Sequence, residues 1–457
     1  MPDQSHEMPS HAEEVSPATS NPPPADGRQA YVVLAGCVLL QLPIWSFTIS
    51  YGVFRDYYVS PSTAGQIDGD LSQTGIIGTT LNGIMYMSMP ILFGIFTNRL
   101  ACYRRHAAFL GALLAAISLM ASSFARSVWQ LTLTQGVLQA IGSTVLYSST
   151  TIYLDEWFIR RKGFAYGVIL STKSTVGVGV PLLFGHLLSE LGFRTTLRIW
   201  SAVTICTALP AIMFLRPRQP LQASRPRDRR LSWSFLRHPT FYIFQLANIV
   251  FSASYGMPQT YLSSFASDVL GFSTATSALI LAALNAPSIV ACFWFGLLSD
   301  GGGLFRQGRS LPIATVSLLS ATGACLPVFL LWGLIPGAKT VGIVLLTLFA
   351  ILYGFFAGGW SATWGGVVKE VQREAEAHNE AIDTGLVYGL LNGGRGIGFV
   401  AGGLIGVELL KTGAVNAEAA ENQWAYGSSY GSLIIFTGVG AALSGVSVLC
   451  KQRQLLC

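Results

Sequence analysis

Two positively charged side chains stand in the middle of long apolar stretches of the sequence. Lys173 lies in the stretch 163–188 and Arg395 in the stretch 383–409, whereas each of the 22 acidic residues lies in a polar tail, in a connection or near the end of a stretch. A charge without a partner is costly in apolar surroundings. We therefore expect an arriving anion to neutralise these two cations. The alternative is that polar side chains and water hold them.

The two cations differ in the chemistry that they can perform. Arginine stays protonated and can hold a carboxylate through two parallel hydrogen bonds, whereas a buried lysine loses its proton readily. We interpret Arg395 as a permanent anchor for an anion. Lys173 is interpreted as a titratable partner whose protonation accompanies binding of that anion.

The composition places these stretches in a lipid bilayer. Of the 457 residues, 51% are hydrophobic and 11% are charged, and the mean hydropathy is +0.51. An ordinary soluble domain has about 25% charged residues. This deficit argues against soluble enzymes, nucleic-acid binders and disulfide-rich secreted domains. The seven cysteines lack the spacing of a zinc or redox site, and we expect no metal and no cofactor.

Apolar stretches long enough to cross about 30 Å of hydrocarbon follow one another along the chain. We expect twelve transmembrane helices, at 31–54, 74–96, 106–124, 128–153, 163–188, 196–215, 240–263, 273–298, 311–334, 340–366, 383–409 and 426–450. The expected division is a disordered cytoplasmic tail at 1–29, a six-helix bundle at 30–215, a basic cytoplasmic linker at 216–239, a second six-helix bundle at 240–450 and a short cytoplasmic tail at 451–457.

The distribution of cations predicts the orientation of these helices. With the N-terminus in the cytoplasm, 20 of the 28 Lys and Arg residues lie in cytoplasmic segments and six lie on the other side. Positive charge favours the cytoplasmic side of a membrane. Both termini are therefore expected in the cytoplasm. For this multi-pass protein we expect a monomer in the plasma membrane, with the vacuolar membrane as the second choice.

The two predicted bundles are related by an internal repeat. The segment 47–52 (FTISYG) resembles the segment 251–256 (FSASYG), 204 residues further on. Four more pairs are each 222 residues apart: Gly163 with Gly385, Tyr166 with Tyr388, Gly167 with Gly389, and Lys173 with Arg395. A pseudo-twofold axis along the membrane normal therefore relates the bundles, and a binding site is expected between them. Each cation lies ten residues after the glycine of its repeat, about 15 Å along a helix and near the membrane midplane.

Neutral polar side chains on several predicted helices could line a path beside the cations. Those that we expect to contact the substrate with Arg395 and Lys173 are Asn392, Tyr51, Tyr255, Gln245, Asn248, Gln139 and Tyr147. Gln259 belongs to the same group of polar residues in the stretch 240–263. Each of these side chains could instead form a hydrogen bond between helices.

Twelve helices in two related halves, with charged loops after the second and eighth, resemble the major facilitator superfamily. Its loop signature, Gly-x-x-x-Asp-Arg-x-Gly-x-Arg-Arg, corresponds here to Gly94, Asn98, Arg99, Ala101, Arg104 and Arg105, and its second copy keeps Gly296 and Asp300. The resemblance implies a latch between the halves on the cytoplasmic side. The residues expected to act in gating are Asn98, Arg99, Arg104, Arg105, Asp155, Arg160, Arg161 and Asp300.

Within that superfamily the chain is similar to the monocarboxylate transporter family, especially its fungal branch. The residues that carry this similarity are the segment 26–33 (DGRQAYVV) before the first helix and the segment 157–167 (WFIRRKGFAYG) leading into the fifth. Animal members couple to protons through charged residues in helices one and eight, and both helices lack a charge in their core here. Proton coupling therefore rests on the argument about Lys173 alone.

The sequence as a whole predicts a secondary transporter rather than an enzyme. We expect it to move a small organic anion, a monocarboxylate or a carboxylated metabolite, by alternating access, with a possible link to protons. Efflux of a specialised fungal metabolite is an alternative. A receptor that binds substrate without transporting it is an alternative of another class. No nucleophile or acid cluster lies inside a predicted span, and nucleic acid is not an expected partner.

Overall fold

The computed structural model describes residues 23–59, 67–97, 100–218, 232–299, 311–336, 339–417 and 424–454. Its first half contains α1 (Arg28–Leu39), α2 (Gln41–Val59), α3 (Gly75–Met87), α4 (Met89–Thr97), α5 (Arg104–Ser122), α6 (Val128–Leu131), the π-helix η4 (Thr132–Leu138), α7 (Gln139–Trp157) and α8 (Lys162–Phe214), with short 3₁₀ turns η2 (Leu71–Thr74) and η3 (Ala101–Tyr103).

The second half has the same kind of organisation. It contains α9 (Pro239–Asp268), α10 (Thr274–Ser299), α11 (Ile313–Pro327), the π-helix η6 (Val328–Trp332), α12 (Lys339–Gly359), α13 (Trp364–Ala377), α14 (Thr384–Ala417) and α15 (Gly431–Gln454), with 3₁₀ turns η5 (Ser234–Arg237), η7 (Trp360–Thr363) and η8 (Ala425–Gly427). Helices dominate because a membrane offers no water to satisfy backbone polar groups.

These helices make the predicted twelve crossings. Within the described residues, eight helical segments are long and apolar enough to span a membrane, and α8 is one of them. Gly192 has φ 74°, a left-handed conformation that glycine adopts easily, and it divides α8 into two antiparallel limbs. The helical segments 128–157, 239–268 and 431–454 complete the set. The all-α, twelve-helix fold is therefore confirmed.

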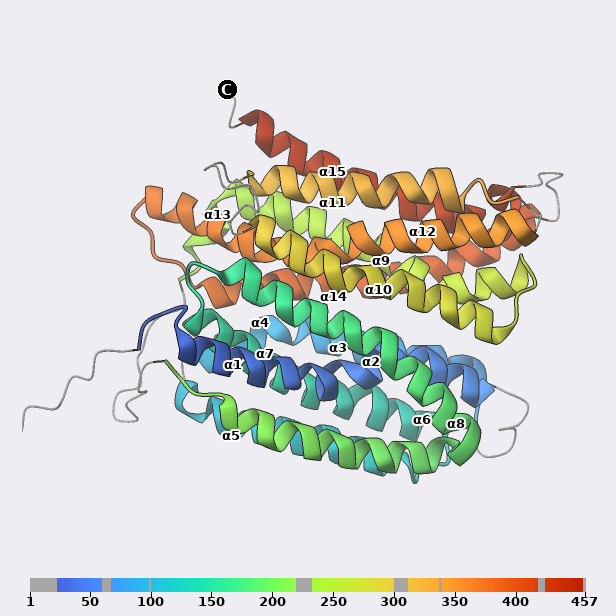
Figure 1. Ribbon diagram of the computed structural model, residues 1–457, viewed down its shortest axis with the longest axis horizontal. Helices are drawn as coiled ribbons and strands as arrows, with labels where there is room; N and C mark the ends of the chain where they lie inside the picture. Colours follow the sequence, from blue (N-terminus) through green and yellow to red (C-terminus); the bar gives the residue numbers. More distant parts are fainter. Residues whose placement is uncertain are drawn as a thin grey trace, which may run out of the picture.

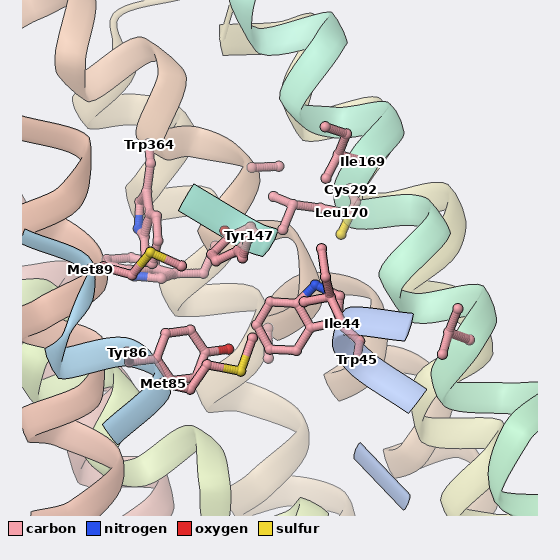
Figure 2. Close-up of a cluster of buried hydrophobic side chains, with 14 of the residues drawn as sticks. Ile44, Trp45, Met85, Tyr86, Met89, Tyr147, Ile169, Leu170, Cys292 and Trp364 are labelled. Atoms are coloured by element: carbon pink, nitrogen blue, oxygen red, sulfur yellow. The ribbon is translucent and has the colours of Figure 1, made fainter. Parts of the chain in front are cut away.

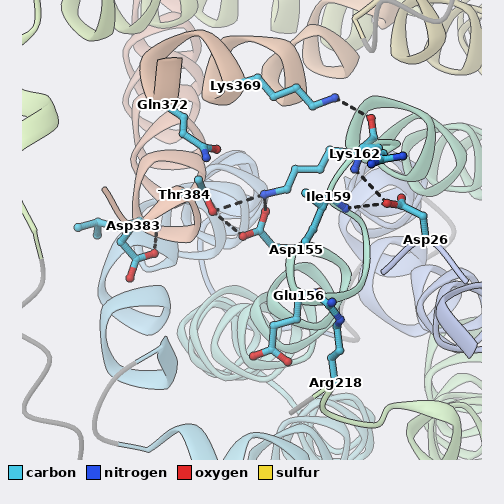
Figure 3. A network of polar contacts seen from close by, with 12 residues as sticks. Asp26, Asp155, Glu156, Ile159, Lys162, Arg218, Lys369, Gln372, Asp383 and Thr384 are labelled. Carbon is cyan, nitrogen blue, oxygen red and sulfur yellow. Dashed lines mark hydrogen bonds and ion pairs between the residues drawn. The ribbon is translucent and has the colours of Figure 1, made fainter. Parts of the chain in front are cut away.

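The molecule consists of two bundles that lie side by side (Figure 1). Helices α1 to α8 form one bundle, drawn in blue to green, and α9 to α15 form the other, drawn in yellow-green to red. The described chain begins and ends at the same side of the molecule. We call this side the terminus face. Asp26, Asp155 and Lys369 lie there (Figure 3), as does Arg104 through its ion pair with Glu156.

The contacts between the bundles follow the internal repeat. The first limb of α8 packs against α10, and α14 packs against α3 and α4. The predicted pseudo-twofold axis exchanges these two interfaces. It relates the first limb of α8 to α14, and it relates α10 to α3 and α4. Small residues permit the close approach: a Cβ on Gly296 would collide with the carbonyl oxygen of Gly163.

Two pairs of equivalent residues lie on this axis. The rings of Tyr166 and Tyr388 stack with centroids 4.5 Å apart and planes at 15°. Lys162 and Thr384, the first residues of α8 and α14, both bond to the carboxylate of Asp155. Residues 222 apart in the chain therefore meet at the centre, and the two six-helix bundles are related by a pseudo-twofold axis as the sequence predicts.

Candidate functional site

Arg395 lies on α14 in the interior between the bundles, and only 7% of its surface is exposed. Its Nη1 donates a hydrogen bond to Ser361 Oγ of η7. Four aromatic rings surround the guanidinium: the carbon Cζ lies 5.1 Å from the ring centroids of Tyr255 and Phe399 and 5.7 Å from those of Tyr86 and Trp364. Phe399 follows Arg395 by one helical turn and shares its face of α14.

Lys173 approaches the same region from the other bundle. Its ammonium lies 3.6 Å from the ring centroid of Trp45 and donates a hydrogen bond of 2.9 Å to the hydroxyl of Tyr86. Cation–π contacts of this kind contribute about 2 kcal/mol or more once water is excluded. They hold the charge without neutralising it.

Tyr86, on α3, links the two cations. Its ring stacks on Phe399 with centroids 5.6 Å apart and planes at 9°, and the ring of Trp45 lies 5.7 Å from it at a tilt of 41°. Trp45 also packs edge-on against Tyr147 of α7, at 5.2 Å. Figure 2 shows Trp45, Tyr86, Tyr147 and Trp364 in one continuous cluster. The site is therefore two cations set in an aromatic environment.

Several polar atoms in this cluster lack a protein partner. Within the described residues, no carboxylate forms an ion pair with Lys173 or Arg395. The donors Arg395 Nε and Trp364 Nε1 and the acceptor Asn392 Oδ1 are buried without a hydrogen bond. A buried donor without an acceptor costs about 1–3 kcal/mol. These two donors, one on the permanently charged guanidinium and one on the indole beside it, are suited to the oxygens of a carboxylate.

Asn248 and Gln245, both on α9, hold α14 in place. The amide of Asn248 donates to the carbonyl of Leu391 at 2.7 Å, and that of Gln245 donates to the carbonyl of Leu390 at 2.8 Å. Both acceptors lie one turn before Arg395. These two side chains therefore orient the helix that carries the cation.

The remaining predicted contact residues lie in two groups. Asn392, one turn from Arg395, and Tyr147 and Tyr255 belong to the cluster around the cations. Tyr51 donates to the carbonyl of Thr74 at 2.5 Å, and Gln139 accepts from Ser118 at 2.5 Å. These last two side chains join helices of the first bundle. They therefore form the hydrogen bonds between helices that the sequence offers as the alternative to substrate contact.

The terminus face carries polar contacts between the two bundles. Asp155, at the end of α7, accepts from Lys162 at 2.5 Å and from Thr384 of the other bundle at 2.6 Å. Lys369 of α13 donates to the carbonyl of Arg160 at 3.0 Å. Figure 3 shows this network. We call Asp155, Lys162 and Thr384 the axial latch.

Further contacts at this face fix the loop before α8. The carboxylate of Asp26 accepts from the backbone amides of Arg160 and Arg161, at 3.0 and 3.2 Å. Arg104 pairs with Glu156, and Arg105 beside it is exposed. Asn98, Arg99 and Asp300, which were also expected to act in gating, lie outside the described residues.

Sequence reasoning missed Tyr86, Ser361, Trp364, Phe399, Lys162 and Thr384. Helical periodicity predicts that Phe399, four residues after Arg395, shares its face of the helix. The repeat predicts that Thr384, 222 residues after Lys162, occupies the equivalent position. Tyr86 had no such signal, because its partners come from two distant helices. In the part of the chain that the structure describes, no group of His, Cys, Asp and Glu residues is placed to hold a metal ion.

Two bundles of membrane-spanning helices with a buried polar site between them define a multi-pass membrane protein. The sequence model of the Major Facilitator Superfamily matches residues 33–403, and the chain belongs to this superfamily. Among solved structures, the crystal structure of the human organic anion transporter MFSD10 (TETRAN) has the same fold. It matches with a TM-score of 0.65 over 92% of this chain and 100% of that chain, at 15% identity.

Related sequences include fungal and animal transporters. MFS-type transporter pynF of Aspergillus niger is 25% identical over 78% of this chain and 80% of its own length. The Fujikurins efflux protein of Gibberella fujikuroi is 25% identical over 97% of this chain and 86% of its own. Monocarboxylate transporter 10 of Mus musculus is 30% identical over 40% of this chain and 35% of its own. The chain is therefore a transporter and not an enzyme.

Proposed function

We propose that the transporter carries a small organic anion, a monocarboxylate or a carboxylated metabolite, and binds it beside Arg395 and Lys173. One observation carries this proposal: repeat-equivalent cations from the two halves both contact Tyr86, and among the described residues neither has a carboxylate partner. The carboxylate of a substrate would supply the missing charge and accept from Arg395 Nε and Trp364 Nε1.

In this proposal the anion moves by alternating access around the fixed site. The axial latch keeps the terminus face closed in the conformation described above, and its release would expose the site on that side. The gating residues Asn98, Arg99, Arg104, Arg105, Asp155, Arg160, Arg161 and Asp300 retain the role expected from the sequence.

A proton accompanies the anion in the same proposal. Lys173 is held by one hydroxyl and one ring face rather than by an acid. A lysine in such surroundings loses its proton far more easily than an arginine. Binding of the anion would favour the protonated amine, so that anion and proton move together.

For the cellular setting we propose a monomer in the plasma membrane, with both termini in the cytoplasm, one bundle at 30–215 and the other at 240–450. Efflux of a specialised metabolite is the second candidate, and it is supported by the similarity to a protein named for fujikurins efflux. Net movement out of cells rather than into them would favour it. Binding without any flux would favour a receptor.

The test is uptake of a panel of labelled carboxylates into proteoliposomes. The purified wild-type protein is expected to take up at least one of them, faster when the side to which the substrate is added is more acidic. Arg395→Ala should lose at least about 90% of the flux, since a charged hydrogen bond is worth about 1.5–3 kcal/mol. Arg126→Ala, at an exposed loop position, is the matched control and should transport normally.

Two results would contradict parts of this proposal separately. Normal flux in Arg395→Ala would refute the anchor. Flux that is indifferent to the pH gradient would refute proton coupling through Lys173 and leave the anion site standing.

A further inference from the structure

A second cluster of polar side chains lies next to Arg395, on the side away from the terminus face. Tyr255 and Gln259 are one turn apart on α9, and Asn285 is on α10; we call these three residues the neutral triad. The amide nitrogen of Gln259 donates to the Tyr255 hydroxyl and to Asn285 Oδ1, each at 3.1 Å. Asn285 donates to the carbonyl of Leu281 at 3.0 Å, which fixes its orientation.

The neutral triad belongs to the second bundle and reaches the interface with the first bundle at one of its ends. At one end, the ring of Tyr255 lies 5.1 Å from the guanidinium carbon of Arg395. At the other end, a Cβ on Gly177 of α8 would lie 3.9 Å from Asn285 Oδ1. Gly177 follows Lys173 by one helical turn. The triad therefore faces the plane between the halves, next to both cations.

The triad keeps hydrogen-bonding capacity that the protein leaves unused. The hydroxyl of Tyr255 accepts from Gln259, and the amide nitrogen of Gln259 serves two acceptors. Within the described residues, the Tyr255 hydroxyl proton and Gln259 Oε1 have no partner. A donor and an acceptor thus stand side by side among aromatic rings. Because both groups are neutral, they are suited to a neutral polar group and not to a charged one.

We propose that the neutral triad is a second substrate subsite, which binds an uncharged hydroxyl or carbonyl group while Arg395 binds the carboxylate. This inference rests on the anion transport proposed above. Gln259 lies one turn, about 5.4 Å, further along α9 than Tyr255, whose ring borders the guanidinium of Arg395, so the two groups of the substrate would be separated by at least about one helical turn. The substrate class is a carboxylate with an apolar, ring-bearing body and a neutral polar group at its far end.

A pair of probes that differ in one hydroxyl tests this subsite. Uptake of 3-(4-hydroxyphenyl)propionate and of 3-phenylpropionate is measured in proteoliposomes that contain the full-length protein. Wild type should favour the hydroxylated anion in kcat/KM by about tenfold, as one well-placed hydrogen bond allows. Gln259→Leu should reduce this ratio to about one and leave uptake of 3-phenylpropionate nearly unchanged.

Two further variants keep the test decisive. Asn285→Leu removes the acceptor that orients Gln259, and it should reduce the ratio in the same direction even if Gln259→Leu does not fold. Thr260→Ala changes the exposed neighbour on α9 and should keep the wild-type ratio. A structural role alone would slow both probes equally and leave the ratio intact.

The possible failures are distinguishable. Equal uptake of the two probes by the wild type overturns the subsite and leaves the anion function in place. A preserved preference in both Gln259→Leu and Asn285→Leu overturns it as well. Absence of uptake for both probes and for the whole carboxylate panel overturns the proposed function, and the subsite with it.

Discussion

Arg395 and Lys173 occupy equivalent positions but are held in different ways. Arg395 is fixed by Ser361 and by four rings, so that its guanidinium has little freedom. Lys173 has one hydroxyl and one close ring. A planar guanidinium that keeps donors in reserve suits a fixed anchor, whereas an amine on a flexible stem suits a group that exchanges a proton. The aromatic setting therefore supports different roles for the two cations.

The unpaired donor on Trp364 gives a prediction at this scale. Trp364→Phe keeps an aromatic ring beside Arg395 but removes Nε1–H, which is buried without a protein acceptor. If a substrate carboxylate is its acceptor, KM for the best carboxylate should rise about fivefold, while the unfolding temperature in detergent should not fall by more than a few degrees. An unchanged KM would show that this donor does not contact the substrate.

At the scale of elements, the starts of α8 and α14 meet at one carboxylate. Asp155 bonds to Lys162 and to Thr384, and it lies near the N-terminus of α14, where a negative charge is favourable. The two helices that begin at this point carry Lys173 and Arg395 three turns further on. Any motion that separates the bundles at the terminus face must therefore break the bond between Thr384 and Asp155.

Weakening this latch should open the terminus face more often. Thr384→Val removes the hydroxyl that joins the second bundle to Asp155, which should increase the open population about fivefold for a loss of about 1 kcal/mol. The readout is maleimide labelling of Cys292, which is buried at the interface between α8 and α10. Cys292→Ser gives the background.

A lipid-facing threonine provides the matched control. Thr322→Val, on the exposed side of α11, should label at the wild-type rate. Equal labelling rates for Thr384→Val and wild type would contradict the assignment of Thr384 to the latch.

At the scale of the whole molecule, the repeat decides where the site and the latch lie. Tyr166 and Tyr388 stack on the axis, between the latch at the terminus face and the two cations deeper in the protein. The two interfaces between the bundles are equivalent under this axis. One symmetric arrangement therefore places the proposed gate and the proposed site along the same axis.

The orientation of the whole molecule is tested by labelling from one side. Cys102 is exposed at the terminus face, which the distribution of cations predicts to lie in the cytoplasm. A membrane-impermeant maleimide should label it only after the cells are permeabilised. Cys102→Ser identifies the signal that belongs to this residue, and equal labelling of intact and permeabilised cells would contradict the orientation.

Much of this organisation could be predicted from the sequence because it depends on local properties. Hydropathy along the chain predicts twelve transmembrane helices. The constant separation of matching residues predicts the internal repeat, and the number of residues before Lys173 and Arg395 predicts how far along their helices they lie. A charge inside an apolar stretch is visible without any knowledge of its neighbours. The same is true of a glycine break such as Gly192, which separates two helices.

Tertiary packing alone decided which side chains meet. Tyr51 and Tyr255 are equivalent in the repeat, yet Tyr51 bonds to Thr74 within its own bundle while Tyr255 lies over Arg395. Tyr86 became the link between the cations because α3 packs against α14. The sequence determines the faces and depths of helices through short-range periodicity, whereas contacts between helices depend on their rotation and spacing, which only the packed bundle defines.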